Sequence, residues 1–211
     1  MSRKTDRKEA TVISASRPLI ILRGHMCSGK STCFKKLREQ KEHLFGFVFV
    51  DHVAIKTMYS KLGDVKRREN GKIWTAAMVD SCVRDADIRG VVTEEISVEC
   101  LRNYMTEIPE YHGFNVLVFE FIVSEEIAYQ RNIERRMERG LEPRSRENMQ
   151  EMREKYFGQL EEQERKEAIE EGSEIVVIDT DKMDQDETLR FVLDAIRLRL
   201  IGQSSTSGSE S

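Results

Sequence analysis

The sequence predicts a three-layer α/β/α fold, in which a five-stranded parallel sheet lies between two layers of helices. Two observations support this prediction: strand-like and helix-like runs alternate along the chain, and the strand-like runs are almost wholly apolar. Such alternation is typical of parallel strands joined by helical crossovers, and a strand that is apolar throughout is typical of one buried on both faces. A chain of 211 residues is long enough to form one such domain with a full core.

The expected strands are short runs rich in β-branched and aromatic residues. The second strand ends at Asp51, and the third ends in the acidic pair Glu94 and Glu95. In chain order, the five strands are expected at residues 19–22, 45–50, 90–95, 115–123 and 173–179.

The expected helices lie between these strands, where apolar residues recur at helical spacing. The helix after the fourth strand has the clearest ends, because Ser124 can cap its start and Gly140 its end. In chain order, helices are expected at residues 31–37, 53–62, 73–83, 124–140, 146–171 and 187–200.

Both ends of the chain are polar, so we expect a disordered segment at residues 1–16 and a disordered, serine-rich tail at residues 202–211. A single domain is expected at residues 17–201. The formal net charge is −4, and no apolar stretch approaches membrane-spanning length. We therefore expect a cytoplasmic protein without a membrane partner, for which nucleic acid enters only as a candidate substrate.

Residues 24–31, with the sequence GHMCSGKS, fit the phosphate-binding pattern G-x-x-x-x-G-K-[ST] at every fixed position. We call these residues the phosphate loop. The pattern requires a strand before the loop and a helix after it, and both are expected here. Its glycines let backbone N–H groups approach a phosphate closely. The loop therefore predicts a nucleoside triphosphate site, with ATP and Mg²⁺ as cofactors.

The residues of the loop have separate expected tasks. Lys30 reaches the β- and γ-phosphates and takes part in catalysis, and the hydroxyl of Ser31 binds Mg²⁺. Cys27 lies inside the loop, where it is either a small filler or a thiol whose oxidation would block the nucleotide. The residues expected to bind the nucleotide are Gly24, His25, Met26, Cys27, Ser28, Gly29, Lys30, Ser31 and Thr32.

Acidic residues at strand ends are candidates for the chemistry of phosphoryl transfer. Asp51 either accepts the proton of a substrate hydroxyl or caps the helix that follows it. Glu94 is favoured over Glu95 as the acid associated with the metal. Because ligands bind beyond the carboxyl ends of parallel strands, these acids and the phosphate loop are expected to meet at one edge of the sheet.

Arginines are concentrated in residues 131–146, just after the fourth strand, and this segment is expected to be a helical lid. An arginine can hold phosphate oxygens with both arms of its guanidinium group and neutralise charge in the transition state. Arg131 and Arg135 lie four residues apart on one helical face, and with Arg136 they are favoured over Arg139. The alternative is an exposed helix with salt bridges to the interleaved glutamates.

These residues resemble those of the small P-loop kinases. Residues 24–32 are similar to the GxMGSGKST loop of shikimate and gluconate kinases, with Cys27 where those kinases often carry glycine. Asp51 and the run 127–136 resemble the substrate-acid and lid regions of the zeta-toxin and polynucleotide-kinase-like group. The resemblance implies that Asp51 activates the acceptor hydroxyl and that Arg131 or Arg135 binds ATP phosphates. The chain departs from the D-x-x-R arrangement of that group, because Lys56 is the basic residue after Asp51.

The sequence therefore predicts a P-loop kinase that is dependent on ATP and Mg²⁺. Its acceptor is expected to be a small metabolite, a nucleoside or nucleotide, or the end of a polynucleotide. Two alternatives remain at this point: a regulatory P-loop ATPase that acts as a switch for a protein partner, and a nucleic-acid-binding ATPase. The N-K-x-D motif of guanine-specific switches is absent from the sequence, and the acidic balance weighs against the last alternative.

Overall fold

The computed structural model describes residues 17–40, 42–59, 64–95, 114–156 and 174–202. Five strands form one sheet in the order β2-β3-β1-β4-β5, and every pair of neighbouring strands is parallel. The predicted fold class is therefore confirmed. The strands are β1 (Arg17–Gly24), β2 (Phe47–Val50), β3 (Gly90–Glu95), β4 (Phe114–Ile122) and β5 (Glu174–Asp179).

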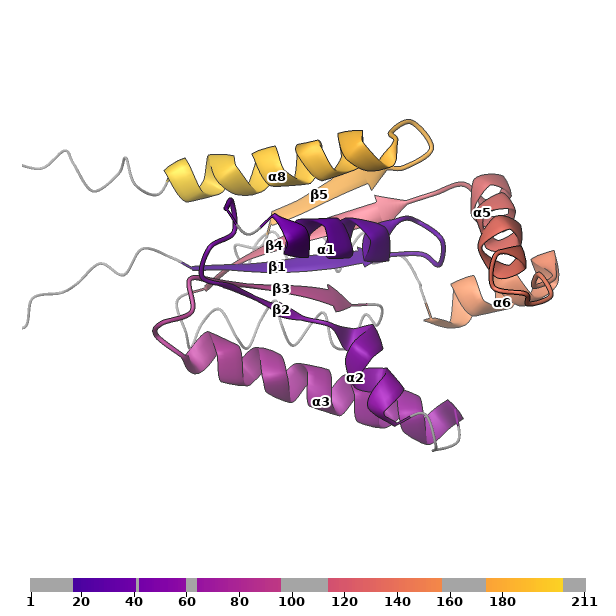
Figure 1. Ribbon diagram of the computed structural model, residues 1–211, viewed down its shortest axis with the longest axis horizontal. Coiled ribbons are helices and arrows are strands. Elements are labelled where there is room, and N and C mark those ends of the chain that lie inside the picture. Colours follow the sequence, from indigo (N-terminus) through magenta and orange to yellow (C-terminus); the bar gives the residue numbers. More distant parts are fainter. Residues whose placement is uncertain (1–16, 41, 60–63, 96–113, 157–173, 203–211) are drawn as a thin grey trace, which may run out of the picture.

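Helices cover both faces of the sheet (Figure 1). Helices α1 and α8 pack together on one face, and α2 and α3 pack together on the other. Helices α5 and α6 lie beyond the carboxyl ends of the strands. The described helices are α1 (Lys30–Glu39), α2 (His52–Met58), α3 (Asp64–Arg84), α5 (Glu125–Met137), α6 (Arg146–Tyr156) and α8 (Gln185–Gly202). No described helix is long and apolar enough to cross a membrane.

Alternate residues of the central strand β1 point into two separate cores. Leu19 and Ile21 pack toward α2 and α3 with Val79 and Val83, whereas Ile20 and Leu22 belong to the core that lies against α1 and α8. All four of these β1 side chains are fully buried. Burial on both faces explains why the strands read as continuous apolar runs in the sequence.

The order of the strands determines where a ligand can bind. The chain leaves β1 for β2, returns to β3 on one side of β1, and then continues to β4 on the other side. A crevice forms beyond the carboxyl end of the strand at which such a sheet reverses its direction of winding. Strand β1 is that strand, and the phosphate loop follows it directly.

The helix ends show where the sequence was informative and where it was not. Ser124 caps α5 by accepting a hydrogen bond from the Ile127 amide, and Gly140 follows the helix in a left-handed conformation, as expected. Helix α3 begins at Asp64 rather than at residue 73. Gly71 lies inside the helix where α3 packs against α2; a Cβ atom there would lie 3.3 Å from the Cβ atom of Lys56. The terminal segments at residues 1–16 and 203–211, and the expected helix beyond residue 156, lie outside the described residues.

Candidate nucleotide-binding site

The phosphate loop joins β1 to α1 by a backbone path that ordinary side chains rarely allow. Gly24 has a φ of 152°, and a Cβ atom there would lie 2.3 Å from the carbonyl oxygen of Phe121. Cys27 has a φ of 63°, which is left-handed for a residue with a side chain. This conformation explains why glycine suits the Cys27 position in similar loops. The loop then enters α1, whose first amides bond back to the carbonyl oxygen of Gly29.

Lys30 lies at the start of α1 and is bent back into the loop. Its Nζ atom donates a hydrogen bond to the carbonyl oxygen of His25 at 3.2 Å. The side chain is buried, with only 8% of its surface exposed. Burial lowers the pKa of Lys30, and the nearby carboxylate of Glu94 acts in the opposite direction. The cation is therefore held inside the loop before any phosphate arrives.

Ser31 and Glu94 form the second feature of the site. The Ser31 hydroxyl donates a hydrogen bond of 2.6 Å to Oε2 of Glu94. Glu94 pairs with Leu22 across β3 and β1, so its carboxylate lies beside the end of β1. Burial raises the pKa of Glu94, while the bond from Ser31 and the charge of Lys30 act to lower it. The Glu95 side chain lies outside the described part of the structure, so only the Glu94 carboxylate is placed beside Ser31.

The oxygens of Ser31 and Glu94 suit a magnesium ion better than a metal ion whose ligands all come from the protein. Within the described residues, no group of three or more His, Cys, Asp or Glu side chains could hold a metal. Mg²⁺ is usually held by one or two protein oxygens, with water and substrate phosphates completing its shell. Ser31 and Glu94 supply two such oxygens, next to the loop on which phosphates would lie.

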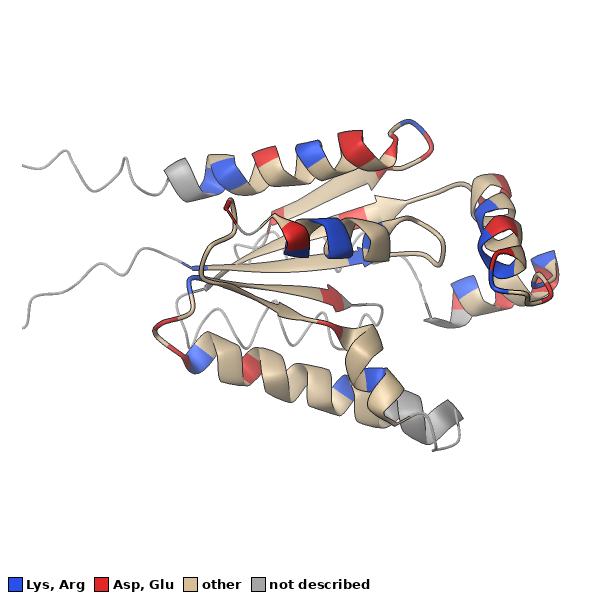
Figure 2. Cartoon of the chain, viewed as in Figure 1, with Lys and Arg blue, Asp and Glu red and all other residues tan. Residues whose placement is uncertain are grey.

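A cavity of about 980 Å³, which we call the large cavity, opens above the phosphate loop. Its walls come from the loop, α2, α5 and the segment between β5 and α8. Basic and acidic residues are interleaved on α5 (Figure 2), and the cavity wall on this side is lined by Arg131, Arg135 and Arg139 together with Glu134 and Glu138. The phosphate loop thus opens into a cavity whose far wall has a small excess of positive charge, an arrangement that would attract a polyanion.

The lid arginines take different positions around this cavity. Arg131 donates to the carbonyl oxygens of Cys27 (3.3 Å) and Thr180 (2.7 Å), and to the Thr180 hydroxyl (3.1 Å). It thereby ties the phosphate loop to the segment after β5. Arg135 and Arg139 both line the large cavity, whereas Arg136 donates to the carbonyl oxygen of Glu142. Although Arg136 was favoured over Arg139 from the sequence, Arg139 is the one that reaches the cavity.

Asp51 has a structural task in the described protein. Its Oδ1 atom accepts a hydrogen bond of 2.9 Å from the amide of Ala54 and so caps α2, and its Oδ2 atom lies 3.6 Å from Arg38. Asp51 does not line the large cavity, but its neighbours His52 and Lys56 do. The capping alternative is therefore present in the structure, and the catalytic role of Asp51 stays a prediction.

His52 lines the large cavity, although no specific role was predicted for it. It is buried, and its Nδ1 atom lies 3.0 Å from the Thr75 hydroxyl. That hydroxyl donates to the carbonyl oxygen of Gly71 at 2.7 Å, so Nδ1 of His52 must be the donor to Thr75. Burial lowers the pKa of His52 to about 4, with the charges of Lys56 and Lys72 adding to the effect. At neutral pH a neutral imidazole therefore lines the large cavity.

The structure brings most of the predicted residues to one place. One group of residues lies at the carboxyl ends of β1 and β3: the phosphate loop, Glu94, Arg131 and Arg135. Asp51 lies at the margin of this group. Sequence reasoning missed the segment after β5, because no motif distinguishes it from an ordinary turn. The missed residues that line the large cavity are Thr180, Met183, Asp184, Gln185 and Thr188.

Comparisons with known proteins bear on the fold and the family of the chain. No curated protein sequence matches the chain significantly. Solved structures of the same fold, each at low identity, include a proposed kinase from Chloroflexus aurantiacus J-10-fl, with 17% identity over 86% of this chain and 97% of that chain and a TM-score of 0.60. A gluconokinase from Sinorhizobium meliloti 1021 has 16% identity over 91% of this chain and 98% of that chain, with a TM-score of 0.55. A chain of the Pnkp1/Rnl/Hen1 RNA repair complex has 17% identity over 64% of this chain and 42% of that chain, with a TM-score of 0.51.

A family model described as an AAA domain matches residues 19–158. This match spans the phosphate loop, Glu94, Arg131 and Arg135, which the structure gathers around the large cavity. The expected resemblance to small P-loop kinases is confirmed. The chain belongs to this AAA domain family, and its five-stranded parallel sheet has the fold of a P-loop kinase.

Proposed function

We propose that the protein is a phosphotransferase that uses ATP and Mg²⁺ to phosphorylate a hydroxyl or phosphate group of an acceptor. One observation carries the proposal: the hydrogen bond between Ser31 and Glu94 lies next to buried Lys30, at the mouth of the large cavity. A cation, a hydroxyl and a carboxylate in this arrangement are the parts that phosphoryl transfer requires around the β- and γ-phosphates.

Each part has a distinct role in the proposed reaction. The loop amides and Lys30 hold the phosphates, while Ser31 and Glu94 would hold Mg²⁺, which supplies charge neutralisation on the phosphate oxygens when bound. Lys30 must give up its bond to the His25 carbonyl oxygen, or share it, when a phosphate enters. Because this bond already fixes its ammonium group in the loop, little rearrangement is needed.

The transfer itself forms one bond and breaks another. The acceptor oxygen bonds to the γ-phosphorus, the bond from that phosphorus to the β,γ-bridging oxygen breaks, and ADP leaves. In the proposal, Asp51 takes the proton of the acceptor hydroxyl through Oδ2, since Oδ1 is bound to the Ala54 amide. Arg38, 3.6 Å from Oδ2, would help to orient this carboxylate. Arg135 and Arg139, which line the large cavity, would face the phosphates from the lid side.

The proposal is tested by measuring ADP formation from ATP and Mg²⁺ with panels of metabolites, nucleosides and oligonucleotides with free 5′ ends. We expect consumption of ATP to depend on one class of acceptor and to stop when Mg²⁺ is removed by a chelator. Slow ATP consumption that no acceptor changes would contradict a phosphotransferase and favour the regulatory ATPase. Calorimetric titration with ATP and Mg²⁺ serves as the control for nucleotide binding.

A further inference from the structure

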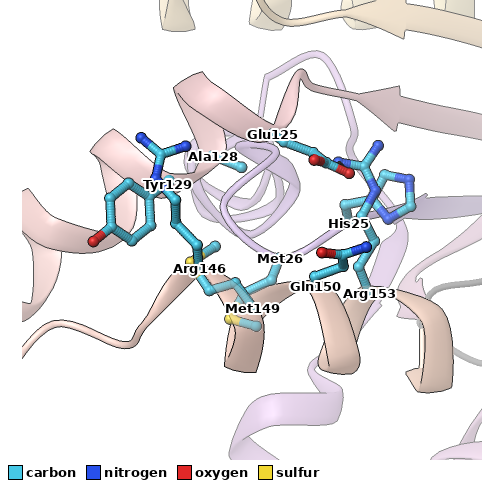
Figure 3. Close-up of a pocket in the computed structure, with 9 residues that line it drawn as sticks. All are labelled: His25, Met26, Glu125, Ala128, Tyr129, Arg146, Met149, Gln150 and Arg153. Carbon is cyan, nitrogen blue, oxygen red and sulfur yellow. Dashed lines mark ion pairs between the residues drawn. The ribbon is translucent and has the colours of Figure 1, made fainter.

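A second, smaller cavity lies on the other side of the phosphate loop (Figure 3). It has a volume of about 170 Å³, which is about six times the volume that a water molecule occupies in the liquid. Its walls are the start of the loop, the first turns of α5 and one face of α6. We call it the small cavity. It is too small for a nucleotide and large enough for a compact metabolite or part of one.

The small cavity and the large cavity are neighbours, because Met26 lines both. His25, whose carbonyl oxygen accepts the Lys30 hydrogen bond, also lines the small cavity. A molecule in the small cavity would therefore lie next to the residues that we propose hold the γ-phosphate. That is where the acceptor of a phosphoryl group has to be.

The lining favours an anion. Arg153 and Arg146 both border the small cavity, and the one acidic residue in its lining is Glu125. The buried imidazole of His25 has its pKa lowered to about 4 by burial and by the charges of Arg153, Lys30 and Arg23, so it is neutral at pH 7. With two arginines, one glutamate and a neutral imidazole, the net charge of the lining is positive.

The two arginines differ in how firmly they are held. Arg146 makes two hydrogen bonds to Glu126, at 2.7 and 2.9 Å, and its guanidinium lies 4.2 Å from the centre of the Tyr129 ring. Arg153 has a longer ion pair with Glu125 (3.8 Å), whose side chain is 70% exposed. An exposed pair at this distance contributes little to stability. An incoming anion could therefore replace Glu125 beside Arg153 at small cost.

We propose that the small cavity anchors the acceptor, and that the acceptor is a small hydroxylated molecule with a carboxylate or phosphate group bound by Arg153 and Gln150. Met26, Met149 and the Tyr129 ring contact its carbon skeleton. This inference rests on the proposed function. It goes beyond it by assigning a chemical class to the acceptor and residues to its recognition.

The test compares three probes that share a three-carbon skeleton: glycerate, glycerol 3-phosphate and glycerol. D-Gluconate and glucose 6-phosphate extend the panel to larger anions. We expect ADP formation with at least one anionic probe and none above background with glycerol; the better of the carboxylate and phosphate probes identifies the anion. Turnover with glycerol equal to that with the anions, or no turnover with any anion while ATP binds normally, overturns the inference. Failure of ATP binding itself would instead contradict the proposed function.

Variants locate the effect in the small cavity. Arg153→Gln should raise the KM for the anionic probe about 10- to 100-fold and leave the KM for ATP unchanged, since hydrogen bonds to charged groups have effects of this size. Arg153→Lys should recover part of the loss. Arg84→Gln, which removes an exposed arginine paired with Asp80 on α3, is the matched control and should change neither constant. Gln150→Ala gives a second route to the same result if Arg153→Gln does not fold. An unchanged KM for the anion in folded Arg153→Gln overturns the assignment.

Discussion

The two sides of the phosphate loop are built in different ways. On the nucleotide side, the main contacts come from consecutive residues and from backbone groups of the loop. On the proposed acceptor side, the residues of the small cavity come from α5, α6 and the start of the loop, and the proposed base Asp51 lies just before α2. Two of these residues already have protein partners: Asp51 caps α2, and Arg153 pairs with Glu125. The nucleotide side is thus preformed, whereas the acceptor side would bind by exchanging weak protein contacts for ligand contacts.

This difference predicts that variants on the two sides fail in different ways. Variants of the nucleotide side should lose ATP use and keep their fold. Variants of the acceptor side should alter the acceptor KM or the rate of transfer, and some should also alter stability. The predictions below are ordered from the largest expected effect to the smallest.

Lys30→Met should have the largest effect. The change removes the charge and keeps most of the buried methylene chain, so ATP turnover should fall about 1,000-fold, as when a preorganised donor is lost from other active sites. Because burial disfavours the Lys30 charge in the folded protein, the free energy of unfolding should stay the same or rise. Steady-state kinetics and denaturant unfolding measure the two effects. Lys36→Met, on the same helix with an ion pair to Asp186, is the control. Normal ATP turnover in a folded Lys30→Met variant would contradict the proposal that the phosphate loop binds ATP.

Asp51→Asn separates catalysis from capping. An asparagine oxygen can still accept the bond from the Ala54 amide, but it cannot take a proton, so we expect kcat to fall about 100-fold or more with ATP affinity and stability retained. Asp51→Ala should in addition lose about 1 kcal/mol of stability through the missing cap. If Asp51→Asn transfers phosphate at the normal rate, capping is the whole role of this residue.

The sequence was sufficient to predict the fold and the position of the phosphate loop between β1 and α1, but less so for the rest. Buried parallel strands and a contiguous motif leave a local pattern, and β3 matches its expected bounds from Gly90 to Glu95. Helix α3 begins earlier than expected, at Asp64, and it includes Gly71, whose contact with Lys56 of α2 no local pattern reveals. The choice of Arg139 over Arg136 depends on how α5 is rotated against the loop. The small cavity depends on three separate segments meeting in space.

Arg131 and Arg135 of the lid are expected to have different roles, one structural and one in binding phosphate. Arg131→Ala removes three hydrogen bonds that join the loop to Thr180, so both stability and turnover should fall. Arg135→Ala should reduce turnover about 10-fold or more and leave stability nearly unchanged, because Arg135 lines the cavity and its charge would act on bound phosphate. Thermal unfolding alongside kinetics distinguishes the two arginines. Equal losses of stability in both variants would contradict the difference.

The pH dependence of stability should show the smallest effect. The folded-state pKa of His52 is about 4, below the usual value of 6.5, so the unfolded chain takes up its proton first as the pH falls. The contribution of neutral His52 to the free energy of unfolding is therefore complete above pH 6.5. It is lost as the pH falls toward 4, at about 1.4 kcal/mol per pH unit. His52→Asn keeps a donor near Thr75 and should reduce this slope. The raised pKa of Glu94 changes stability with pH in the opposite direction. The free energy of unfolding is therefore compared between wild type and His52→Asn at each pH. An unchanged slope would contradict the buried neutral imidazole.

The central claim is that the phosphoryl group of ATP passes to an acceptor and not to water. The most direct measurement follows the label from γ-³²P-ATP in the presence of Mg²⁺ and the best anionic probe, with Asp51→Asn run in parallel. The account predicts that label appears in the acceptor in step with ADP formation and that Asp51→Asn binds ATP but transfers little. Label found only in inorganic phosphate, at a rate that the acceptor does not change, would contradict it.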